Sequence, residues 1–389
     1  MRDLAIVAFV LSHACPLKCD FCCSTREVVG RGRIRRPMME ELMIRFGREP
    51  AIDRFAFTGG EAFLYLDDIK AAVSAARKAG VTQPFQIVTS AYWATGPGQV
   101  RAILGELRGL GMDLIGLSYD HEHAKWVTPE QITIVCDVAA ELGMKINLWG
   151  TFWEVGDRVE DLLPEVTARS EVNAQNFRVA EMGRAKTSRS WPRRYDVPID
   201  EKFTCGRPGN YSLAIYPDGE VYPCCSGGIQ IEGKLSCGNV NRDPPSRIIY
   251  AALTNFHVRM VKEFGWGILY ELVEREAPEL VSRLPKFEEA DGVCAICRDL
   301  NLTVKDALAP IYHKVEVEYA RARARFEWLD REKADGRGGY RRVGEDIFSS
   351  EEFLDRVVAD RGLRLDYLAG LVQIGRCVDD EKVLERVDG

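Results

Sequence analysis

The chain has 389 residues, 46% of them hydrophobic, so it can bury a large core and is long enough for two or three structural units. Its 52 basic and 59 acidic residues give a formal charge of −7, which argues against a broad nucleic-acid-binding surface. No apolar run reaches membrane-spanning length, and the first ten residues are too short for a secretory signal. We therefore expect a cytoplasmic chain without a membrane or nucleic-acid partner, whose twelve cysteines serve metal ligation rather than disulfides.

Up to about residue 190, short apolar runs alternate with amphipathic helical stretches, the pattern of a parallel α/β sheet. Asp67 is predicted to cap a helix that Gly80 ends, and Thr128 with Pro129 to open one that Gly143 ends. The predicted strands are 4–11, 54–57, 85–89, 113–117, 145–150 and 176–179. Six such strands predict an open, partial barrel with its site at the carboxyl ends of the strands.

Three cysteines directly follow the first predicted strand: Cys15, Cys19 and Cys22. Three thiolates cannot complete a four-iron cluster, so one iron would stay open to a small molecule. The alternative is a structural zinc site. Such sites usually show paired Cys-x-x-Cys units with a fourth ligand at a regular distance, and His13 is the only histidine near these cysteines in the sequence.

A second motif, Thr58-Gly59-Gly60-Glu61, stands at the end of the second predicted strand. Glycines allow a backbone to come close to a bound ligand, and a neighbouring carboxylate can receive an ammonium group. Glycines also make ordinary turns, so this motif gains its meaning from its place beside the cysteines.

The remaining cysteines gather further along the chain. Pro217-Asp218-Gly219 predicts a hairpin turn that places Cys224 on the second strand of the hairpin. Cys225 has no evident partner once Cys224 is a ligand; it could give a hydrogen atom to a substrate radical, act as an alternate ligand, or be a buried spare thiol. Cys23 and Cys237 are weaker candidates for the donor role and could be packing residues.

The final segment, 306–389, reads as a highly charged helical extension. A solvated helical cap is the common explanation for such mixed charge, with peptide recognition or self-association as the alternatives.

The Cys15, Cys19 and Cys22 spacing with an aromatic before the last cysteine resembles the signature of radical S-adenosylmethionine (radical SAM) enzymes, and Gly59-Gly60-Glu61 resembles their AdoMet-binding motif. The resemblance implies a [4Fe–4S] cluster whose open iron binds AdoMet and whose electron splits it to a 5′-deoxyadenosyl radical. A reducing partner such as flavodoxin or ferredoxin is then expected. The implied AdoMet contacts are Gly59, Gly60 and Glu61 with the methionine amino group, Thr89 and Ser118 with the methionine or ribose portion, Phe21 with adenine, and Arg184 with the carboxylate. The last four residues could also be ordinary strand-end residues.

The spacing from Cys205 through Gly219 to Cys224 resembles the opening of the SPASM extension, which binds auxiliary clusters in many radical SAM enzymes. The full seven-cysteine pattern is missing, so the chain is more similar to the shortened twitch form. That resemblance implies one auxiliary [4Fe–4S] cluster, with zinc as the alternative, held by Cys205, Cys224, Cys294 and Cys297. The expected domains are a radical SAM barrel over 1–195, a SPASM or twitch domain over 196–305, and the extension over 306–389.

Several stretches resemble radical SAM peptide epimerases, which convert L to D residues in ribosomally made peptides, and Cys225 matches their hydrogen donor. These stretches are 55–61, 90–94, 117–123, 222–226 and 294–297. By the same resemblance Tyr119, Asp120, His121 and His123 would lie near a substrate, although a His-rich loop is often only solvated. No leader-binding module precedes the first predicted strand, which weakens the expectation of a peptide substrate.

Two other functions remain open. One is a radical SAM dehydrogenase of a small alcohol or amino sugar, in which the auxiliary cluster takes an electron from the substrate and no thiol donor is needed. The other is an iron–sulfur electron carrier without catalysis, which gives no role to the glycines and to Glu61.

Overall fold

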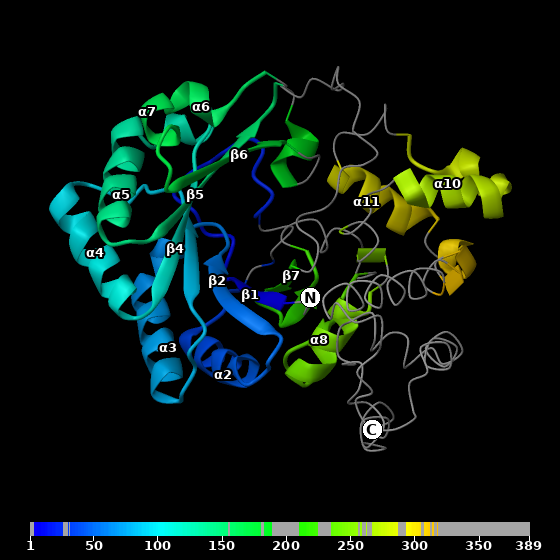
Figure 1. Ribbon diagram of the computed structural model, residues 1–389, viewed down its shortest axis with the longest axis horizontal. Coiled ribbons are helices and arrows are strands. Elements are labelled where there is room, and N and C mark those ends of the chain that lie inside the picture. Colours follow the sequence, from blue (N-terminus) through cyan, green and yellow to red (C-terminus); the bar gives the residue numbers. More distant parts are fainter. Residues whose placement is uncertain are drawn as a thin grey trace, which may run out of the picture.

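The structure is a computed structural model, seen in Figure 1. It describes residues 4–25, 30, 32–154, 156–179, 183–188, 210–224, 235–255, 257, 258, 262, 267–286, 293–304, 307–311, 313, 314 and 317. The predicted ligand Cys205, the predicted donor Cys225 and most of the predicted 306–389 extension lie outside these residues.

Nine strands of the described chain form one open sheet, in the order β6-β5-β4-β3-β2-β1-β7-β8-β9. Strands β1 to β7 run parallel, while β8 and β9 are antiparallel to their neighbours. The strands are β1 Leu4–Val10, β2 Ile52–Thr58, β3 Phe85–Thr89, β4 Met112–Ser118, β5 Lys145–Phe152, β6 Val172–Arg178, β7 Asn210–Ile215, β8 Glu220–Tyr222 and β9 Gly238–Asn239. The prediction of an α/β fold with an open parallel sheet is confirmed.

Two features of the sheet differ from the sequence prediction. Strand β6 begins at Val172 rather than at residue 176. The sequence pattern hid its first residues because β6 is the edge strand of the sheet, and its polar residues do not form the apolar run of a central strand. Strand β7 lies parallel to β1 along its full length, from the Leu4–Asn210 pair to the Phe9–Ile215 pair. One sheet therefore runs across the predicted domain boundary at residue 195.

Helices cover the convex face of the β1 to β6 sheet in Figure 1: α2 Arg36–Gly47, α3 Leu66–Lys78, α4 Pro97–Gly109, α5 Pro129–Glu141, α6 Val159–Leu162 and α7 Pro164–Thr167. The predicted start of α5 is confirmed, since Thr128 forms a capping box with Gln131 and Pro129 opens the helix. The predicted cap at Asp67 is wrong. The short helix η1 Ala62–Tyr65 runs directly into α3, so Tyr65 is the capping residue and Asp67 lies in the first turn.

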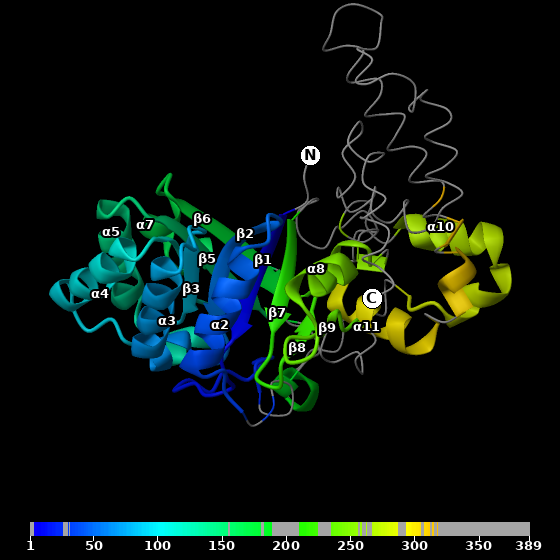
Figure 2. The ribbon, with the colours of Figure 1, turned by 90° about the horizontal axis from the view of Figure 1, so that it is seen from below.

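The main core lies between this sheet and its helices, where the rings of Phe9, Phe55 and Phe57 stack. A second core joins α10 Gly267–Glu276, η5 Pro278–Arg283 and α11 Val293–Thr303. Figure 2 shows these elements and α8 Pro245–Leu253 on the side of β7 away from α3 and α4. Cys297 packs against both cores, so this predicted ligand lies where the two parts of the molecule meet.

None of the helices in the described part of the chain is both long and apolar enough to span a bilayer.

Candidate functional site

The first cysteine motif lies on residues 11–25, called here the cluster loop, which leave the carboxyl end of β1. Burial raises the pKa of Cys15 to about 11 and raises the pKa of Cys22. The pKa of Cys19 is also raised, first by burial, then by Asp120 and by the neighbouring Cys22 and Cys15 sulfurs. Thiols with pKa values raised in this way would stay protonated at neutral pH unless a metal displaced their protons. The donor set fits a [4Fe–4S] cluster with one open iron.

Gly59 and Gly60 bring the end of β2 against the cluster loop. The Gly60 amide donates to the Ser12 carbonyl at 2.7 Å, and the Glu61 amide to the Ala14 carbonyl at 2.9 Å. A Cβ on Gly59, whose φ is +139°, would lie 2.7 Å from the Ser12 oxygen, and one on Gly60 would collide with the Ala14 carbonyl. The sequence suggested that these glycines admit a ligand. In the structure they admit the backbone of the cluster loop.

The carboxylate of Glu61 is buried and receives four hydrogen bonds. Its Oε1 accepts from the Phe63 amide at 3.1 Å and from the Thr89 hydroxyl at 2.7 Å. Its Oε2 accepts from the Ser90 amide at 2.9 Å and the Ser90 hydroxyl at 2.7 Å. A carboxylate has about four acceptor positions, so all of them are taken. Glu61 here links the ends of β2 and β3, and its predicted contact with an ammonium group stays a prediction.

The hydroxyl of Thr89 also has all of its hydrogen-bonding positions occupied by protein groups. Besides donating to Glu61, its hydroxyl accepts from the Ala91 amide and from Trp93 Nε1, both at 3.1 Å. One donor and two acceptors complete the capacity of a hydroxyl. Thr89 therefore belongs to the same brace as Glu61, and its predicted contact with AdoMet stays a prediction. Ser118 lies half-buried at the end of β4, beside Trp149 of β5.

Gly183 and Arg184 hold the opposite side of the cluster loop, from the short helix η3 Gly183–Thr187 after β6. Gly183 has φ +55°, and a Cβ there would collide with the Cys22 carbonyl. The Arg184 amide donates to the Cys22 carbonyl at 3.0 Å and its guanidinium to the Cys19 carbonyl at 2.9 Å. Arg184 was predicted to approach the AdoMet carboxylate, and the structure places this side chain on the loop that carries the cysteines.

The loop after β4 supports the cluster loop from a third direction. Asp120 is fully buried and accepts from the amides of Glu122, His123 and Thr151, at 3.0, 3.0 and 3.1 Å. Glu122 in turn accepts from the Asp20 amide at 3.0 Å. The sequence missed this brace, and its signal was an aspartate directly after a strand, where Asp commonly bonds backbone amides two and three residues on.

His123 and Phe21 form an aromatic wall beside the cysteines. His123 Nδ1 lies 2.9 Å from Asp120 Oδ2, and its ring centroid lies 5.9 Å from that of Phe21. Trp153, which the sequence reasoning did not select, meets Phe21 edge-on with centroids 6.3 Å apart. His121 is more than half exposed and pairs with Asp157, so the two histidines of this loop have different surroundings. A planar base could stack in such a place, as predicted for Phe21 and adenine.

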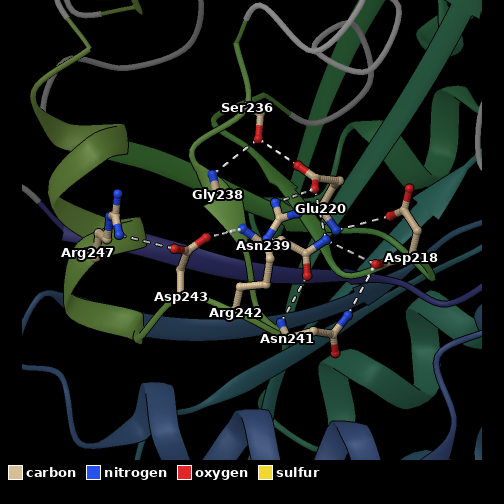
Figure 3. Close-up of polar contacts among 9 residues, drawn as sticks. All are labelled: Asp218, Glu220, Ser236, Gly238, Asn239, Asn241, Arg242, Asp243 and Arg247. Carbon is tan, nitrogen blue, oxygen red and sulfur yellow. Dashed lines mark hydrogen bonds and ion pairs between the residues drawn. The ribbon is translucent and has the colours of Figure 1, made fainter.

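The hairpin of β7 and β8 carries Cys224, and polar contacts hold its turn, as Figure 3 shows. Gly219 has φ +88°, as the predicted turn requires. The side-chain amides of Asn239 and Asn241 donate to the Asp218 carbonyl at 3.2 and 3.3 Å. Glu220 accepts from the Ser236 hydroxyl at 2.7 Å. This network joins β8, β9 and the turn into one unit that ends two residues before Cys224.

The hairpin reaches the cluster loop. The pKa of Cys23 is raised to about 12, mainly by burial and to a smaller extent by the nearby thiols of Cys22 and Cys224. A Cβ on Gly32, which follows the cluster loop, would lie 3.2 Å from Pro217 Cβ in the hairpin turn. Two cysteine motifs about two hundred residues apart in the sequence therefore come together.

Cys294 and Cys297 lie in the first two turns of α11, three residues apart and so on one face of the helix. A helix N-terminus favours negative charge, which suits thiolates bound to an anionic cluster. Cys224, Cys294 and Cys297 are each half-buried, and none forms a disulfide within the described part of the chain. Their common ligation of one cluster stays a prediction.

Cys237 differs from these three. Its side chain belongs to the main core, its sulfur faces the Leu235 carbonyl at 3.8 Å, and burial raises its pKa to about 12. Its amide donates to the Val221 carbonyl at 2.8 Å. These contacts are those of a packing residue rather than a ligand.

Substitution of Cys237 and of Cys224 is expected to affect the iron content of the protein differently. We expect Cys237→Ala to keep the full iron content and to lose about 1 kcal/mol of stability, the cost of removing one buried group of methylene size. We expect Cys224→Ala to lose the iron of one cluster. Iron per chain after anaerobic reconstitution, with urea unfolding, separates the two, and a loss of iron in Cys237→Ala would contradict the packing role.

Comparison with known proteins agrees with this geometry. The model of the radical SAM superfamily matches residues 9–162, and that of SPASM, an iron–sulfur cluster-binding domain, matches 205–262. The putative peptide biosynthesis protein YydG of Bacillus subtilis (strain 168) is 21% identical over 308 residues, covering 76% of this chain and 91% of its own.

Two solved structures are also similar. Native anSMEcpe with bound AdoMet gives a TM-score of 0.47 at 14% identity, over 80% of this chain and 100% of its own. BtrN in complex with AdoMet and 2-DOIA gives 0.43 at 16% identity, over 68% and 89%. The two domain matches cover the cluster loop and the hairpin that meets it. The chain therefore carries a radical SAM domain followed by a SPASM domain, and its cofactors are AdoMet, a [4Fe–4S] cluster and an auxiliary iron–sulfur cluster.

Proposed function

We propose that this radical SAM enzyme modifies a ribosomally made peptide by converting an L residue to its D form, with Cys225 as the hydrogen-atom donor. Cys15, Cys19 and Cys22 hold the cluster that binds AdoMet, and Cys205, Cys224, Cys294 and Cys297 hold the auxiliary cluster. A peptide substrate is supported by the name of the Bacillus subtilis relative, a putative peptide biosynthesis protein. A flavodoxin or ferredoxin supplies the electrons.

The closeness of Cys224 to the cluster loop supports this reaction most directly. The Cys224 thiol acts on the pKa of Cys23, which follows the proposed ligand Cys22 in the chain. Cys225 is the next residue after Cys224 and lies outside the described residues. A donor at this point of the sequence directly follows a residue whose thiol is near enough to Cys23 to affect its pKa.

The cluster and AdoMet, when bound, supply a 5′-deoxyadenosyl radical that takes the α-hydrogen of the substrate residue. The chain's own residues hold the loops of the site in position. Gly60 and Arg184 fix the cluster loop from two sides, and Asp120 fixes the loop that carries His123. The Cys225 thiol then gives its hydrogen atom to the opposite face of the substrate carbon. The sulfur radical left behind needs one electron and one proton to restore the thiol. Water supplies the proton, and the auxiliary cluster that Cys205, Cys224, Cys294 and Cys297 would hold would supply the electron.

Isotope exchange tests the reaction. The reconstituted enzyme is given dithionite, AdoMet and candidate precursor peptides in D2O, where thiol hydrogens exchange. We expect a product with one added deuterium, no net oxidation, and a D residue at the labelled position. Cys225→Ala should lose peptide turnover while still cleaving AdoMet.

Cys136 provides a matched control, because it is buried in α5 within the main core, away from the cysteine motifs. Cys136→Ala should keep both AdoMet cleavage and deuterium incorporation. A product that has lost two hydrogens, unaffected by Cys225→Ala, would refute epimerisation and favour a dehydrogenase. Absence of any 5′-deoxyadenosine would leave electron transfer as the function.

A further inference from the structure

A buried polar group beside one proposed auxiliary ligand has no part in the reaction above. It consists of Asn301, on α11 one turn after Cys297, and His257, on the segment after α8. Asn301 is 0% exposed and His257 is 5% exposed. Neighbouring residues such as Leu300 on α11 and Val304 just after it belong to an apolar core, and Asn is a poor residue for a helix interior. A buried amide in such a place needs specific partners.

The amide nitrogen of Asn301 faces three polar atoms. It lies 2.7 Å from the Cys297 carbonyl, 3.1 Å from His257 Nε2 and 3.7 Å from Cys297 Sγ. The carbonyl can only accept, so the amide nitrogen, not its oxygen, points to this side. His257 Nε2 lies 3.6 Å from the same sulfur. The two N–H groups of the amide are therefore directed at the backbone and at the gap between the imidazole and the sulfur.

We propose that Asn301 is the outer hydrogen-bond donor to the Cys297 sulfur, that His257 orients its amide, and that the pair sets the reduction potential of the auxiliary cluster. This inference rests on the proposed ligation of that cluster by Cys297. An N–H directed at a cysteine sulfur stabilises the more negative, reduced form of a cluster and so raises its potential.

The measurement is the midpoint potential of the auxiliary cluster in the full-length reconstituted enzyme, followed by EPR during redox titration. AdoMet is added because it alters the EPR signal of the cluster that binds it. The signal that AdoMet leaves unaltered then belongs to the auxiliary cluster. Asn301→Leu has nearly the same volume and no donor, and we expect a lower midpoint potential with full iron content. His257→Leu should lower it as well, whereas His257→Gln, which keeps an acceptor for the amide, should stay near the wild-type value.

Leu302→Met is the matched control, a volume-conserving change on the same helix that should leave the potential unchanged. An unchanged potential in an Asn301→Leu enzyme with full iron content would overturn the inference alone. If that variant does not fold, the His257 pair decides: a potential lowered in His257→Leu and restored in His257→Gln supports the proposal, and equal potentials overturn it. Cys297→Ser tests whether Cys297 is a ligand of the auxiliary cluster. An auxiliary-cluster EPR signal that is unaltered in this variant would refute that ligation, and the inference with it.

Discussion

Replacing Gly60 by alanine is expected to abolish assembly of the AdoMet-binding cluster and to destabilise the fold by about 3 kcal/mol, the upper part of the usual range for overpacking. The new Cβ would collide with the Ala14 carbonyl, a backbone atom that cannot swing aside as the end of a side chain can. Relief requires the cluster loop to move, which would break the bonds from the Gly60 and Glu61 amides to Ser12 and Ala14. Iron per chain after reconstitution and the urea unfolding midpoint measure both effects.

Gly105→Ala is the matched control for this substitution. Gly105 lies inside α4, and a Cβ there would meet nothing within 4 Å. Alanine should stabilise this helix by up to about 1 kcal/mol and leave the iron content unchanged. A Gly60→Ala protein that binds iron and AdoMet as the wild type does would show that the close approach of β2 is not needed to shape the cluster loop.

The order of β1 to β6 could be predicted because each strand is an apolar run separated from the next by a helix with readable ends, such as Thr128 and Pro129 before α5. The position of β7 beside β1 could not. Pairing of strands about two hundred residues apart leaves no mark in the local pattern, since Asn210–Ile215 reads equally well as part of a separate hairpin. The early start of β6 was hidden because an edge strand tolerates polar residues on both faces.

For the site, the cysteine spacing and the glycines marked the right segments, but not what the glycines and polar side chains contact. The sequence places Gly60 at a ligand-binding position, and the structure shows Gly60, and likewise Gly183, pressed against carbonyls of the cluster loop. The partner of a backbone amide or a buried carboxylate is a tertiary contact that neighbouring residues do not encode. The bracing role of Asp120 and the ring contact of Trp153 stayed unrecognised for the same reason, since each gains its role from another loop.

Glu61→Gln is expected to destabilise the protein by about 3 kcal/mol, because the amide group of glutamine would turn two N–H bonds toward groups that themselves donate. On one side these are the Ser90 amide and hydroxyl, on the other the Phe63 amide and the Thr89 hydroxyl. The hydroxyls can rotate, but the backbone amide on either side cannot, so at least one buried N–H loses its acceptor. Urea unfolding of the protein without AdoMet measures this cost.

Two roles for Glu61 predict different results from that variant. If the carboxylate is a brace between β2 and β3, Glu61→Gln loses stability without AdoMet, and the reconstituted variant binds AdoMet with an affinity close to that of the wild type. If it holds the AdoMet ammonium group, the affinity for AdoMet falls at least tenfold while stability without AdoMet is kept, a tenfold loss corresponding to about 1.4 kcal/mol. Glu106→Gln is the control for removing a charge, since Glu106 is exposed and pairs with Lys70 on the surface, where such pairs contribute little. The four donors already around Glu61 favour the first result, because an ammonium group could reach the carboxylate only by displacing one of them.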